Sequence, residues 1–280
     1  MRLKEKLATS LTPDVLSRVY SSFDIVGDIA IIKAPDNPDS ATAIAKQIME
    51  THKKIRTVFS QTSPVEGNHR TRKLTLLAGQ NTTLTKHKEA GCIFIVDVAK
   101  CYFSPRLSHE HLRVAQQIST KETVVNMFAG VGGFSVIIAK TSPQTRIYSI
   151  DINPIAHQFM TQNTQINGVE NRVYPLLGDA KELVETQLQN TANRVLMPLP
   201  EKALQYLPTA VLALKKTGGW IHYYDFEHAT SHENPVEKTQ QKVTEKLGNL
   251  DIKHRFECCR IVRHTGPNWY QTVLDIQITS

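Results

Sequence analysis

The chain has 280 residues and a formal net charge of +7, from 33 lysines and arginines against 26 aspartates and glutamates. Its 40% hydrophobic and 21% charged residues are ordinary for a soluble globular protein, and its length allows one large domain or two smaller ones. No apolar run approaches the roughly 18 to 20 residues that span a bilayer, and MRLKEKLATSL lacks the apolar segment of a secretory signal. We therefore expect a cytoplasmic protein without membrane contact.

The first third of the chain has α+β texture. Strand composition marks FDIVGDIAIIKAP (23–35), RKLTLLAG (72–79) and GCIFIVDVAKCYF (91–103). A helix is predicted in DNPDSATAIAKQIMETHKK, with Asp39 or Ser40 as its cap, because apolar residues recur there at helical spacing. We predict a smaller α+β domain over residues 1–107, which binds RNA or substrate, and an α/β domain over residues 108–280.

The positive charge is concentrated in residues 53–88. This segment holds eight basic residues and one acidic residue, Glu66. A local basic patch is typical of a partner with a phosphate backbone, whereas a solvated charged face is the alternative. The basic residues are Lys53, Lys54, Arg56, Arg70, Arg72, Lys73, Lys86 and Lys88.

From residue 108 onward, helices and strands alternate. SHEHLRVAQQI has helical texture, and five strands follow at TVVNMF, RIYSID, RVYPLLGD, NRVLMPLP and GGWIHYYDF. Helical segments separate them at GGFSVIIAK, NPIAHQFMTQNTQIN, AKELVETQL and PEKALQYLPTAVLAL, and a further one follows at NPVEKTQQKVTEKL. This order predicts a Rossmann-type, mostly parallel sheet, and residues 254–278 predict an antiparallel hairpin around Gly266-Pro267-Asn268.

The four cysteines carry no metal or disulfide pattern. No C-x-x-C pair occurs, and adjacent Cys258 and Cys259 suit neither a zinc site nor an ordinary disulfide. We expect a reducing compartment and no metal ion. We also expect all four cysteines, including Cys92 and Cys101, to be small buried apolar side chains.

Three features at consecutive strand ends indicate a nucleoside cofactor. The G-x-G-G of Gly130, Gly132 and Gly133 permits a tight turn and close backbone approach, but it matches neither G-x-G-x-x-G nor a P-loop. Asp151, about 20 residues later, ends the next strand, where a carboxylate can bind ribose hydroxyls. Asp179 ends the third strand, where it can bind an adenine amine. Each aspartate alone is more often a helix N-cap, but together they predict S-adenosylmethionine.

The ordered motifs VAKCYFSPRLSHEHLRVA, NMFAGVGGFS, SIDINP, LLGDA, NRVLMPLP and GGWIHYYDF make the chain resemble one enzyme family. That family is the class I, archaeal and eukaryotic type of tRNA (guanine-37 N1)-methyltransferase. The resemblance runs from about residue 65 to the C-terminus. It implies a Rossmann-type catalytic domain after a smaller α+β domain, and tRNA, bound at its anticodon stem-loop, as the substrate. The chain is expected to be a monomer of a form that lacks the further N-terminal domain touching the tRNA elbow.

The resemblance assigns catalytic roles to charged residues. Glu110, after SPRL, matches the family's general base, although relatives usually read Glu-Arg where this chain has Glu110-His111. Arg70, with Arg72 as the close alternative, matches the arginine that stabilises negative charge on O6 of guanine. Without the resemblance, a first-turn helix glutamate and phosphate-binding arginines are the simpler interpretations.

The resemblance also implies which residues hold the cofactor. Tyr102 and Arg106 are expected beside it, although core packing and a surface ion pair are the simpler roles for these two. The other residues expected at the cofactor are Phe128, Ala129, Gly130, Gly132, Asp151, Asn153 and Asp179.

The segment Pro198-Leu199-Pro200 is expected at the floor of the transfer site. Proline ends a strand because it cannot donate to the ladder. Enzymes that methylate exocyclic amines carry Asn/Asp-Pro-Pro-aromatic here, so this chain favours a ring nitrogen as the acceptor. Relatives have Asn-Leu-Pro, so Pro200 matches the family and Pro198 departs from it, leaving only a carbonyl to form hydrogen bonds.

Two other functions remain open. The first is a wyosine-pathway tRNA methyltransferase or aminocarboxypropyltransferase acting at the same tRNA position. The retained YFSPRL argues against the aminocarboxypropyl branch. The second is a non-catalytic RNA-binding protein with a relic cofactor fold, against which the intact glycines, Glu110, Asp151 and Asp179 count.

Overall fold

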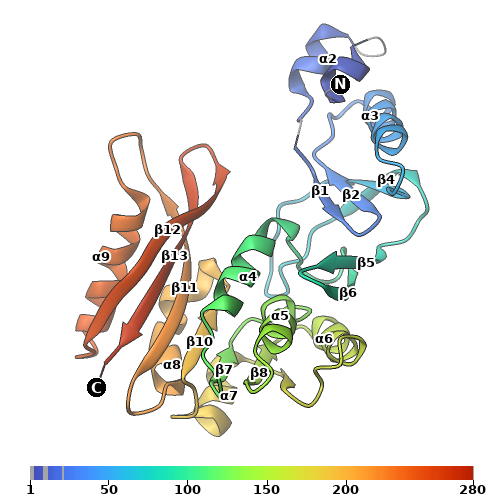
Figure 1. Cartoon of the computed structure of the whole chain (residues 1–280). Coiled ribbons are helices and arrows are strands. Elements are labelled where there is room, and N and C mark those ends of the chain that lie inside the picture. Colours follow the sequence, from blue (N-terminus) through green and yellow to red (C-terminus); the bar gives the residue numbers. More distant parts are fainter. Residues whose placement is uncertain (1–2, 9–11, 21, 280) are drawn as a thin grey trace. The chain divides into compact units, whose positions relative to one another are not determined.

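A computed structural model describes residues 3–8, 12–20 and 22–279 of the chain (Figure 1). The chain forms two compact units, Met1–His109 (unit 1) and Glu110–Ser280 (unit 2). The predicted domain boundary, after residue 107, lies two residues before this division. Within the described residues, no helix is long and apolar enough to cross a membrane.

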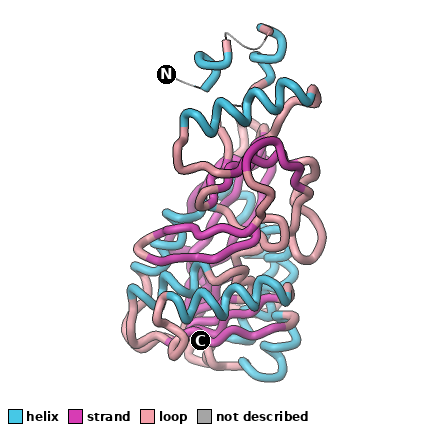
Figure 2. Tube along the Cα trace, turned by 90° about the vertical axis from the view of Figure 1, so that its right-hand side faces the viewer, coloured by secondary structure: helices cyan, strands magenta, loops and turns pink. Residues whose placement is uncertain are grey.

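Unit 1 is built on a four-stranded sheet in the order β1-β2-β3-β4, in which only β2 and β3 are parallel. Helix α3 packs on this sheet through Ile44 and Ile48, against Ala30 and Val58 (Figure 2). The elements are α1 (Leu3–Leu7), α2 (Pro13–Arg18), β1 (Asp24–Val26), β2 (Ile29–Ile32), α3 (Pro38–Thr51), β3 (Thr57–Gln61), β4 (Leu74–Gly79), the hairpin β5 (Leu84–Glu89) and β6 (Cys92–Asp97), and η1 (Pro105–Leu107).

Three expectations for unit 1 need correction. The segment 23–35 is a hairpin and not one strand, because Gly27 turns the chain at φ +58°, where a Cβ would meet the Lys86 carbonyl oxygen at 2.6 Å. Helix α3 is capped by Asn37, whose side chain accepts from the Ser40 N–H, and not by Asp39 or Ser40. Strand β3 lies in a segment for which no element was predicted.

Unit 2 is the predicted Rossmann-type domain. Its seven strands lie in the order β12-β13-β11-β10-β7-β8-β9, and β13 alone among them runs antiparallel to its neighbours. The strands are β7 (Thr123–Asn126), β8 (Arg146–Asp151), β9 (Val173–Leu177), β10 (Arg194–Met197), β11 (Gly219–His228), β12 (His254–Gly266) and β13 (Trp269–Ile278). The order reverses between β7 and β10, and ligands of open α/β sheets bind outside the carboxyl ends of the strands at such a point.

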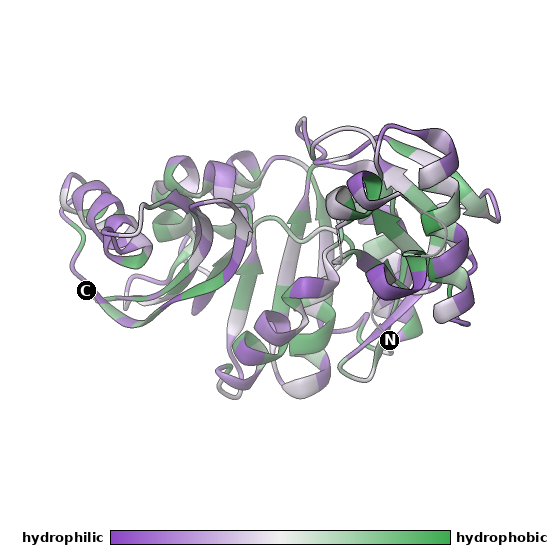
Figure 3. Cartoon of the chain, turned by 90° about the horizontal axis from the view of Figure 1, so that it is seen from above, coloured by the Kyte–Doolittle hydropathy of each residue, from purple (hydrophilic) through white to green (hydrophobic). Residues whose placement is uncertain are grey.

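Helices cover both faces of this sheet. On one face, Val184, Leu207 and Val243 pack against Val195 and Leu274 in a continuous core. Helix α9, beside the C-terminal strands, is mostly hydrophilic on its outer side (Figure 3). The helical elements are α4 (Ser108–Gln116, which spans the division between the units), α5 (Gly133–Thr141), α6 (Pro154–Ile166), α7 (Ala180–Leu183), the π-helical η2 (Val184–Leu188), η3 (Pro200–Lys202), α8 (Ala203–Ala213) and α9 (Pro235–Gly248).

The cysteines are all free thiols, and the described residues contain no cluster of potential metal ligands. Cys92 and Cys101 are buried as expected. Cys258 and Cys259 are only half-buried, because they lie on the edge strand β12.

Candidate active site

Glu110, the predicted general base, is buried in the first turn of α4, with a side chain only 2% exposed. Its Oε1 accepts hydrogen bonds from Arg113 Nη2 at 2.6 Å, from Arg113 Nε at 2.8 Å and from the Tyr224 hydroxyl at 2.8 Å. Its Oε2 is bound by Arg260. A favourable helix dipole alone does not account for a carboxylate that is buried and surrounded by donors.

Strand register places Glu110 at the predicted reaction edge of the sheet. Met197, the last residue of β10, pairs with Tyr223 of β11. The next residue of β11, Tyr224, donates to Glu110. Glu110 therefore lies level with the carboxyl end of β10, where Pro198 begins the predicted floor of the site.

A buried chain of alternating charges supports Glu110 from behind. Arg113, which binds Glu110, also binds both carboxylate oxygens of Asp275. Asp275 lies 2.6 Å from Nδ1 of His222, and Nε2 of His222 lies 2.7 Å from Nη1 of Arg194. The chain of charges ends at Glu122, whose Oε2 accepts a 2.8 Å hydrogen bond from Nε of Arg194. Each buried charge thus has an opposite charge or a dipole as its neighbour, as burial requires.

The neighbours of His222 fix its tautomer. Arginine has donors only, so Nε2 of His222 accepts from Arg194, and Nδ1 carries the hydrogen that it donates to Asp275. Complete burial lowers the pKa of His222, and this effect outweighs the opposing hydrogen bond to Asp275. Burial alone would raise the pKa of Asp275, but hydrogen bonds from His222 and Arg113 hold it well below its usual range.

The glycine-rich turn brings the backbone to Asp151. Gly130 and Gly132 have φ of +57° and +94°, which side chains rarely adopt, so the turn requires glycine. The Gly130 N–H donates to Asp151 Oδ2 at 2.7 Å, and the Asn153 N–H donates to Oδ1 at 2.9 Å. The side-chain oxygen of Asn153 caps helix α6. The turn and the carboxylate at the end of β8 therefore form one structure.

Gly133 packs closely against the helix that carries Glu110, and its approach to a ligand stays a prediction. A Cβ on Gly133 would lie 3.0 Å from Cε1 of His111. His111, which stands where relatives usually have arginine, is buried and meets the ring of Phe134 edge-on, with centroids 4.4 Å apart. The helix that carries Glu110 is thus packed directly onto the first turn of α5.

Asp179 is held by two kinds of donor. Its Oδ1 caps α7 by accepting from the Lys181 N–H at 2.8 Å, and its Oδ2 accepts from the Tyr206 hydroxyl at 2.6 Å. Burial and the negative charge of Asp179 together raise the pKa of Tyr206 to about 12. Burial works against the charged form of Asp179, but the hydrogen bonds lower its pKa. Tyr206 also meets the ring of Phe128 edge-on, with centroids 5.2 Å apart.

The residues at this edge fit an adenosine-bearing cofactor. Asp151 pairs in register with Leu177, so the ends of β8 and β9 are adjacent. Next to the two carboxylates lie exposed apolar side chains, Ile152 at 43% and Leu177 at 50% exposure. Apolar surface beside oriented carboxylates is what a purine ribonucleoside requires.

Unit 1 brings its own predicted site residues into one cluster. The guanidinium of Arg70, a residue with φ +51°, lies 4.1 Å from the ring centroid of Tyr102. Asp24 accepts a 2.7 Å hydrogen bond from Arg106 and forms an ion pair with Arg72 at 3.7 Å. Arg106 and Arg72 are therefore joined through one carboxylate, and the cofactor roles of Arg106 and Tyr102 stay predictions.

The floor segment adopts the shape that its prolines impose. Strand β10 ends at Met197, and Pro200 starts the 3-10 turn η3 that leads into α8. Pro198 and Leu199 are half-buried, and Pro200 is buried. The contacts of Pro198 and Pro200 with a substrate stay predictions.

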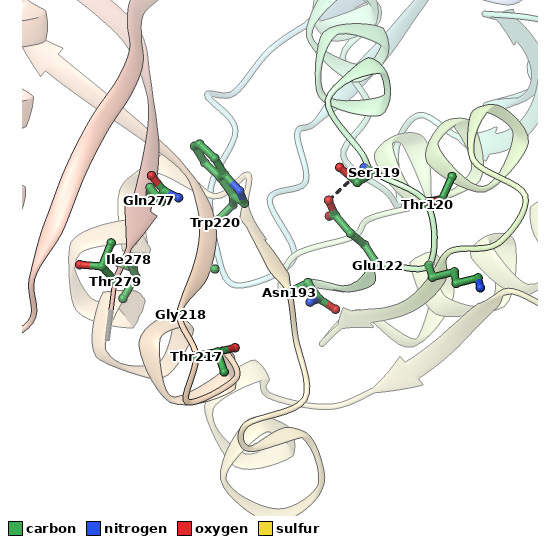
Figure 4. Close-up of a pocket in the computed structure, with 12 residues that line it drawn as sticks. Ser119, Thr120, Glu122, Asn193, Thr217, Gly218, Trp220, Gln277, Ile278 and Thr279 are labelled. Atoms are coloured by element: carbon green, nitrogen blue, oxygen red, sulfur yellow. Dashed lines mark hydrogen bonds between the residues drawn. The ribbon is translucent and has the colours of Figure 1, made fainter.

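A hollow of about 510 Å³ lies at the opposite edge of the sheet and is a different site (Figure 4). Its lining includes Glu122, Asn193 and Trp220, at the amino ends of β7, β10 and β11, and Gln277 near the end of the antiparallel β13. The predicted cofactor residues of unit 2 lie at the carboxyl ends of the parallel strands, so none of them lines this hollow.

Five residues of this site were not predicted from the sequence. They are Arg113, Tyr206, Tyr224, Arg260 and Asp275. Arg113 alone had a local signal, since it follows Glu110 by three residues on one helix. The other four come from distant segments that the sheet brings together.

Comparison with known families agrees with this geometry. The pattern of the TRM5/TYW2 methyltransferase domain matches residues 85–251, and that of the TYW2 N-terminal domain matches residues 3–82. The chain belongs to the TRM5/TYW2 methyltransferase family.

Relatives within the TRM5/TYW2 family carry more than one activity. The tRNA (guanine(37)-N(1))-methyltransferase Trm5b of Pyrococcus abyssi is 36% identical, over 92% of this chain and 75% of its own length. The tRNA 4-demethylwyosine(37)-methyltransferase Taw21 of Saccharolobus solfataricus is 35% identical, over 92% of this chain and 94% of its own length. A solved complex of aTrm5 and tRNALeu is 33% identical, with a TM-score of 0.85, over 100% of this chain and 78% of that one.

Tyr206→Phe tests the predicted adenine contact of Asp179. Loss of the hydroxyl should free the carboxylate and weaken adenosine binding about fivefold, or roughly 1 kcal/mol. Purine riboside, which lacks the 6-amino group, should bind both proteins equally. Calorimetry measures the two affinities, and Tyr174→Phe, whose hydroxyl donates to the Asn171 carbonyl, is the matched control. An equal loss for both nucleosides would contradict the contact.

His222→Gln should remove a pH dependence of stability. Because the pKa of His222 is lowered in the fold, an unfolded histidine takes up a proton below about pH 6.5 before the folded one does. The free energy of unfolding of the wild type should therefore fall as pH falls from about 7, by at most about 1.4 kcal/mol per pH unit from this residue. Glutamine keeps one donor and one acceptor but does not titrate.

Tryptophan fluorescence during urea unfolding can measure this effect, because both tryptophans, Trp220 and Trp269, lie in unit 2. The exposed His232→Gln is the control and should keep the wild-type slope. An unchanged slope in the His222 variant would show that this histidine does not titrate differently in the fold.

Proposed function

We propose that this chain is an S-adenosylmethionine-dependent methyltransferase that transfers a methyl group to N1 of guanine at position 37 of tRNA. The observation that carries the proposal is Glu110, a buried carboxylate that is held by three donors on Oε1 and lies level with the predicted floor. Such a group suits the abstraction of a ring N–H proton. Membership in the TRM5/TYW2 family supports the same reaction.

The cofactor supplies a methyl group on a positively charged sulfur. Asp151 and Asp179 would hold its adenosine part, and the turn at Gly130 and Gly132 would lie against it. The guanine N1–H bond breaks as its proton passes to Glu110, and the N1 electron pair forms the new N–C bond while the S–C electrons return to sulfur. Because Arg113 and Tyr224 occupy Oε1, the proton goes to Oε2.

The floor and the arginines of unit 1 take supporting roles in the proposal. Pro198 and Pro200 shape the floor through the backbone, so it offers no side-chain acceptor for an exocyclic amine. Of the two candidate arginines, the spacing in the family favours Arg70, whose guanidinium lies over the ring of Tyr102, as the group that stabilises charge on O6.

The basic segment is proposed to contact the tRNA backbone. Six of its eight basic side chains are exposed, whereas Arg70 and Arg72 are half-buried. The six exposed side chains can contact successive phosphates of the tRNA backbone, and the half-buried Arg70 and Arg72 have a defined orientation. We further propose that a monomer acts on the anticodon stem-loop, in the cytoplasm. The exposed residues are Lys53, Lys54, Arg56, Lys73, Lys86 and Lys88.

Incubation with labelled cofactor and an unmodified tRNA transcript should produce 1-methylguanosine at position 37. Nucleoside mass spectrometry identifies the product, and a transcript with adenine at position 37 is the control. A chain that binds S-adenosylmethionine but forms no 1-methylguanosine would defeat the proposal.

A second substrate follows from the match to Taw21, whose length this chain covers almost fully. That protein's name gives 4-demethylwyosine at position 37 as its substrate. The same assay with tRNA that carries this tricyclic base separates the two activities, since each product has its own mass. Methylation of the tricyclic base alone would replace guanine as the substrate.

Glu110→Gln should lower the rate of methyl transfer by roughly 10² to 10⁴, because glutamine accepts hydrogen bonds but cannot take the N1 proton. S-adenosylmethionine affinity should change little, since Glu110 is assigned to the base and not to the cofactor. Single-turnover kinetics and calorimetry check the two parts. The variant Glu257→Gln, on a half-exposed glutamate paired with Arg255, is the matched control. An undiminished rate would remove Glu110 from the base role.

A further inference from the structure

The two oxygens of Glu110 have different surroundings. Oε1 accepts from Arg113 twice and from Tyr224 once, which fills its lone-pair directions. Oε2 meets only Arg260 among the described residues. The oxygen that is left for a substrate is therefore the one that Arg260 covers.

Arg260 is positioned for this contact by the sheet. Tyr224 of β11 and Arg260 of β12 both pair with Val273 of β13, so the three residues form one row across the strands. Side chains in such a row share a face, and both outer members reach Glu110. The β12 ladder is irregular between Phe256 and Cys258 and again after Ile261, and such bulges re-aim side chains.

Arg260 differs from Arg113 in exposure and in charge balance. Arg113 is compensated by Asp275 as well as by Glu110, and only 18% of its side chain is exposed. Arg260 has Glu110 as its only ion-pair partner in the described part of the chain, and 38% of its side chain is exposed. Arg260 can therefore move or change partner without breaking the buried chain behind Glu110.

The Glu110–Arg260 pair is complementary to one edge of guanine. On that edge, the N1–H donor lies beside the O6 acceptor. On the protein, the Oε2 acceptor lies beside the guanidinium donors of Arg260, which has five N–H groups in a planar fork. Adenine presents an unprotonated N1 and an amine donor at the same places, so both contacts would be mismatched.

We propose that Arg260 is a further catalytic residue, which covers Oε2 of Glu110 in the free protein and donates to O6 of guanine during methyl transfer. This inference rests on the proposed function. As N1 loses its proton to Oε2, Glu110 becomes neutral and negative charge spreads onto O6. The cation that faced Glu110 then faces O6, so the ion pair changes partner and no isolated charge forms in the site.

The groups around Glu110 allow this exchange. Arg113 approaches from α4, Tyr224 from β11 and Arg260 from β12, while Asp275 of β13 acts through Arg113. Burial raises the pKa of Tyr224 well above its usual value, so this hydroxyl stays a donor throughout. Arg260 is thus the one mobile cation of the set.

Single-turnover formation of 1-methylguanosine by Arg260→Gln, Arg260→Lys and the wild type tests the proposal. Arg260→Gln should be about 100-fold slower than the wild type at neutral pH. Arg260→Lys should be about tenfold faster than Arg260→Gln, because lysine restores the positive charge but not the planar set of guanidinium donors. S-adenosylmethionine affinity should be unchanged. Arg255→Gln, in which the arginine of an exposed pair with Glu257 on the same strand is replaced, should stay within about twofold of the wild type.

The pH profile separates a catalytic role from a structural one. Without this cation, the rate should keep rising with pH beyond the point where the wild type levels off, because ionisation of N1 then lacks the stabilisation that Arg260 gives to O6. The deficit of Arg260→Gln should therefore shrink as pH rises, whereas a merely structural role would give one constant factor. A constant deficit, or a rate within twofold of the wild type, would overturn the proposal.

The wild type distinguishes this inference from the function on which it rests. If the wild type forms 1-methylguanosine and Arg260→Gln does so equally well, only the role of Arg260 fails. If the wild type forms none, both proposals fail. Unchanged tryptophan fluorescence of the variant confirms that unit 2 is folded.

Discussion

Much of the buried polar network of unit 2 depends on the burial of one carboxylate, that of Glu110. An ionised Glu110 in a nearly dry site needs compensating donors, and each cation that compensates it needs a further partner of its own. The chain through Arg113, Asp275, His222 and Arg194 follows from this requirement, because a neutral histidine with one donor and one acceptor can join an aspartate to an arginine. This chain of charges ends where Arg194 pairs with Glu122, so no charge in it is left unpaired at the sheet edge.

The sheet converts this local requirement into a site. Parallel pairing in register brings the carboxyl ends of β7 and β10 to nearly the same level beside β11, and the strand order reverses at this point, where ligands of open α/β sheets bind. Aspartates end or follow β8 and β9, a glycine turn follows β7 and prolines follow β10. The antiparallel β13 then carries Asp275 to His222 and brings Arg260 of β12 within reach of Glu110.

The strands and helices of unit 2 could be predicted from the sequence because apolar periodicity and strand-ending residues are local signals. The hairpin at Gly27 and the cap at Asn37 were misread, since they depend on a contact with Lys86 and on Pro38 as the first helical residue. In the sequence, Asp275 and His222 are single polar residues in apolar strands. Such a residue indicates a buried partner, but the sequence does not identify that partner. The contact of Arg260 with Glu110 depends on bulges and register across three strands, which no local pattern encodes.

The predicted floor and the predicted adenine contact are joined by a single helix. Pro200 begins the turn η3, which continues without a break into α8, and Tyr206 in the first turns of α8 donates to Asp179. Phe128 of the glycine-rich segment packs on the same tyrosine. A shift of the floor as a base enters would therefore move the group that orients Asp179. The prolines on either side of Leu199 restrict the backbone, so the segment that leads from β10 into α8 has little conformational freedom.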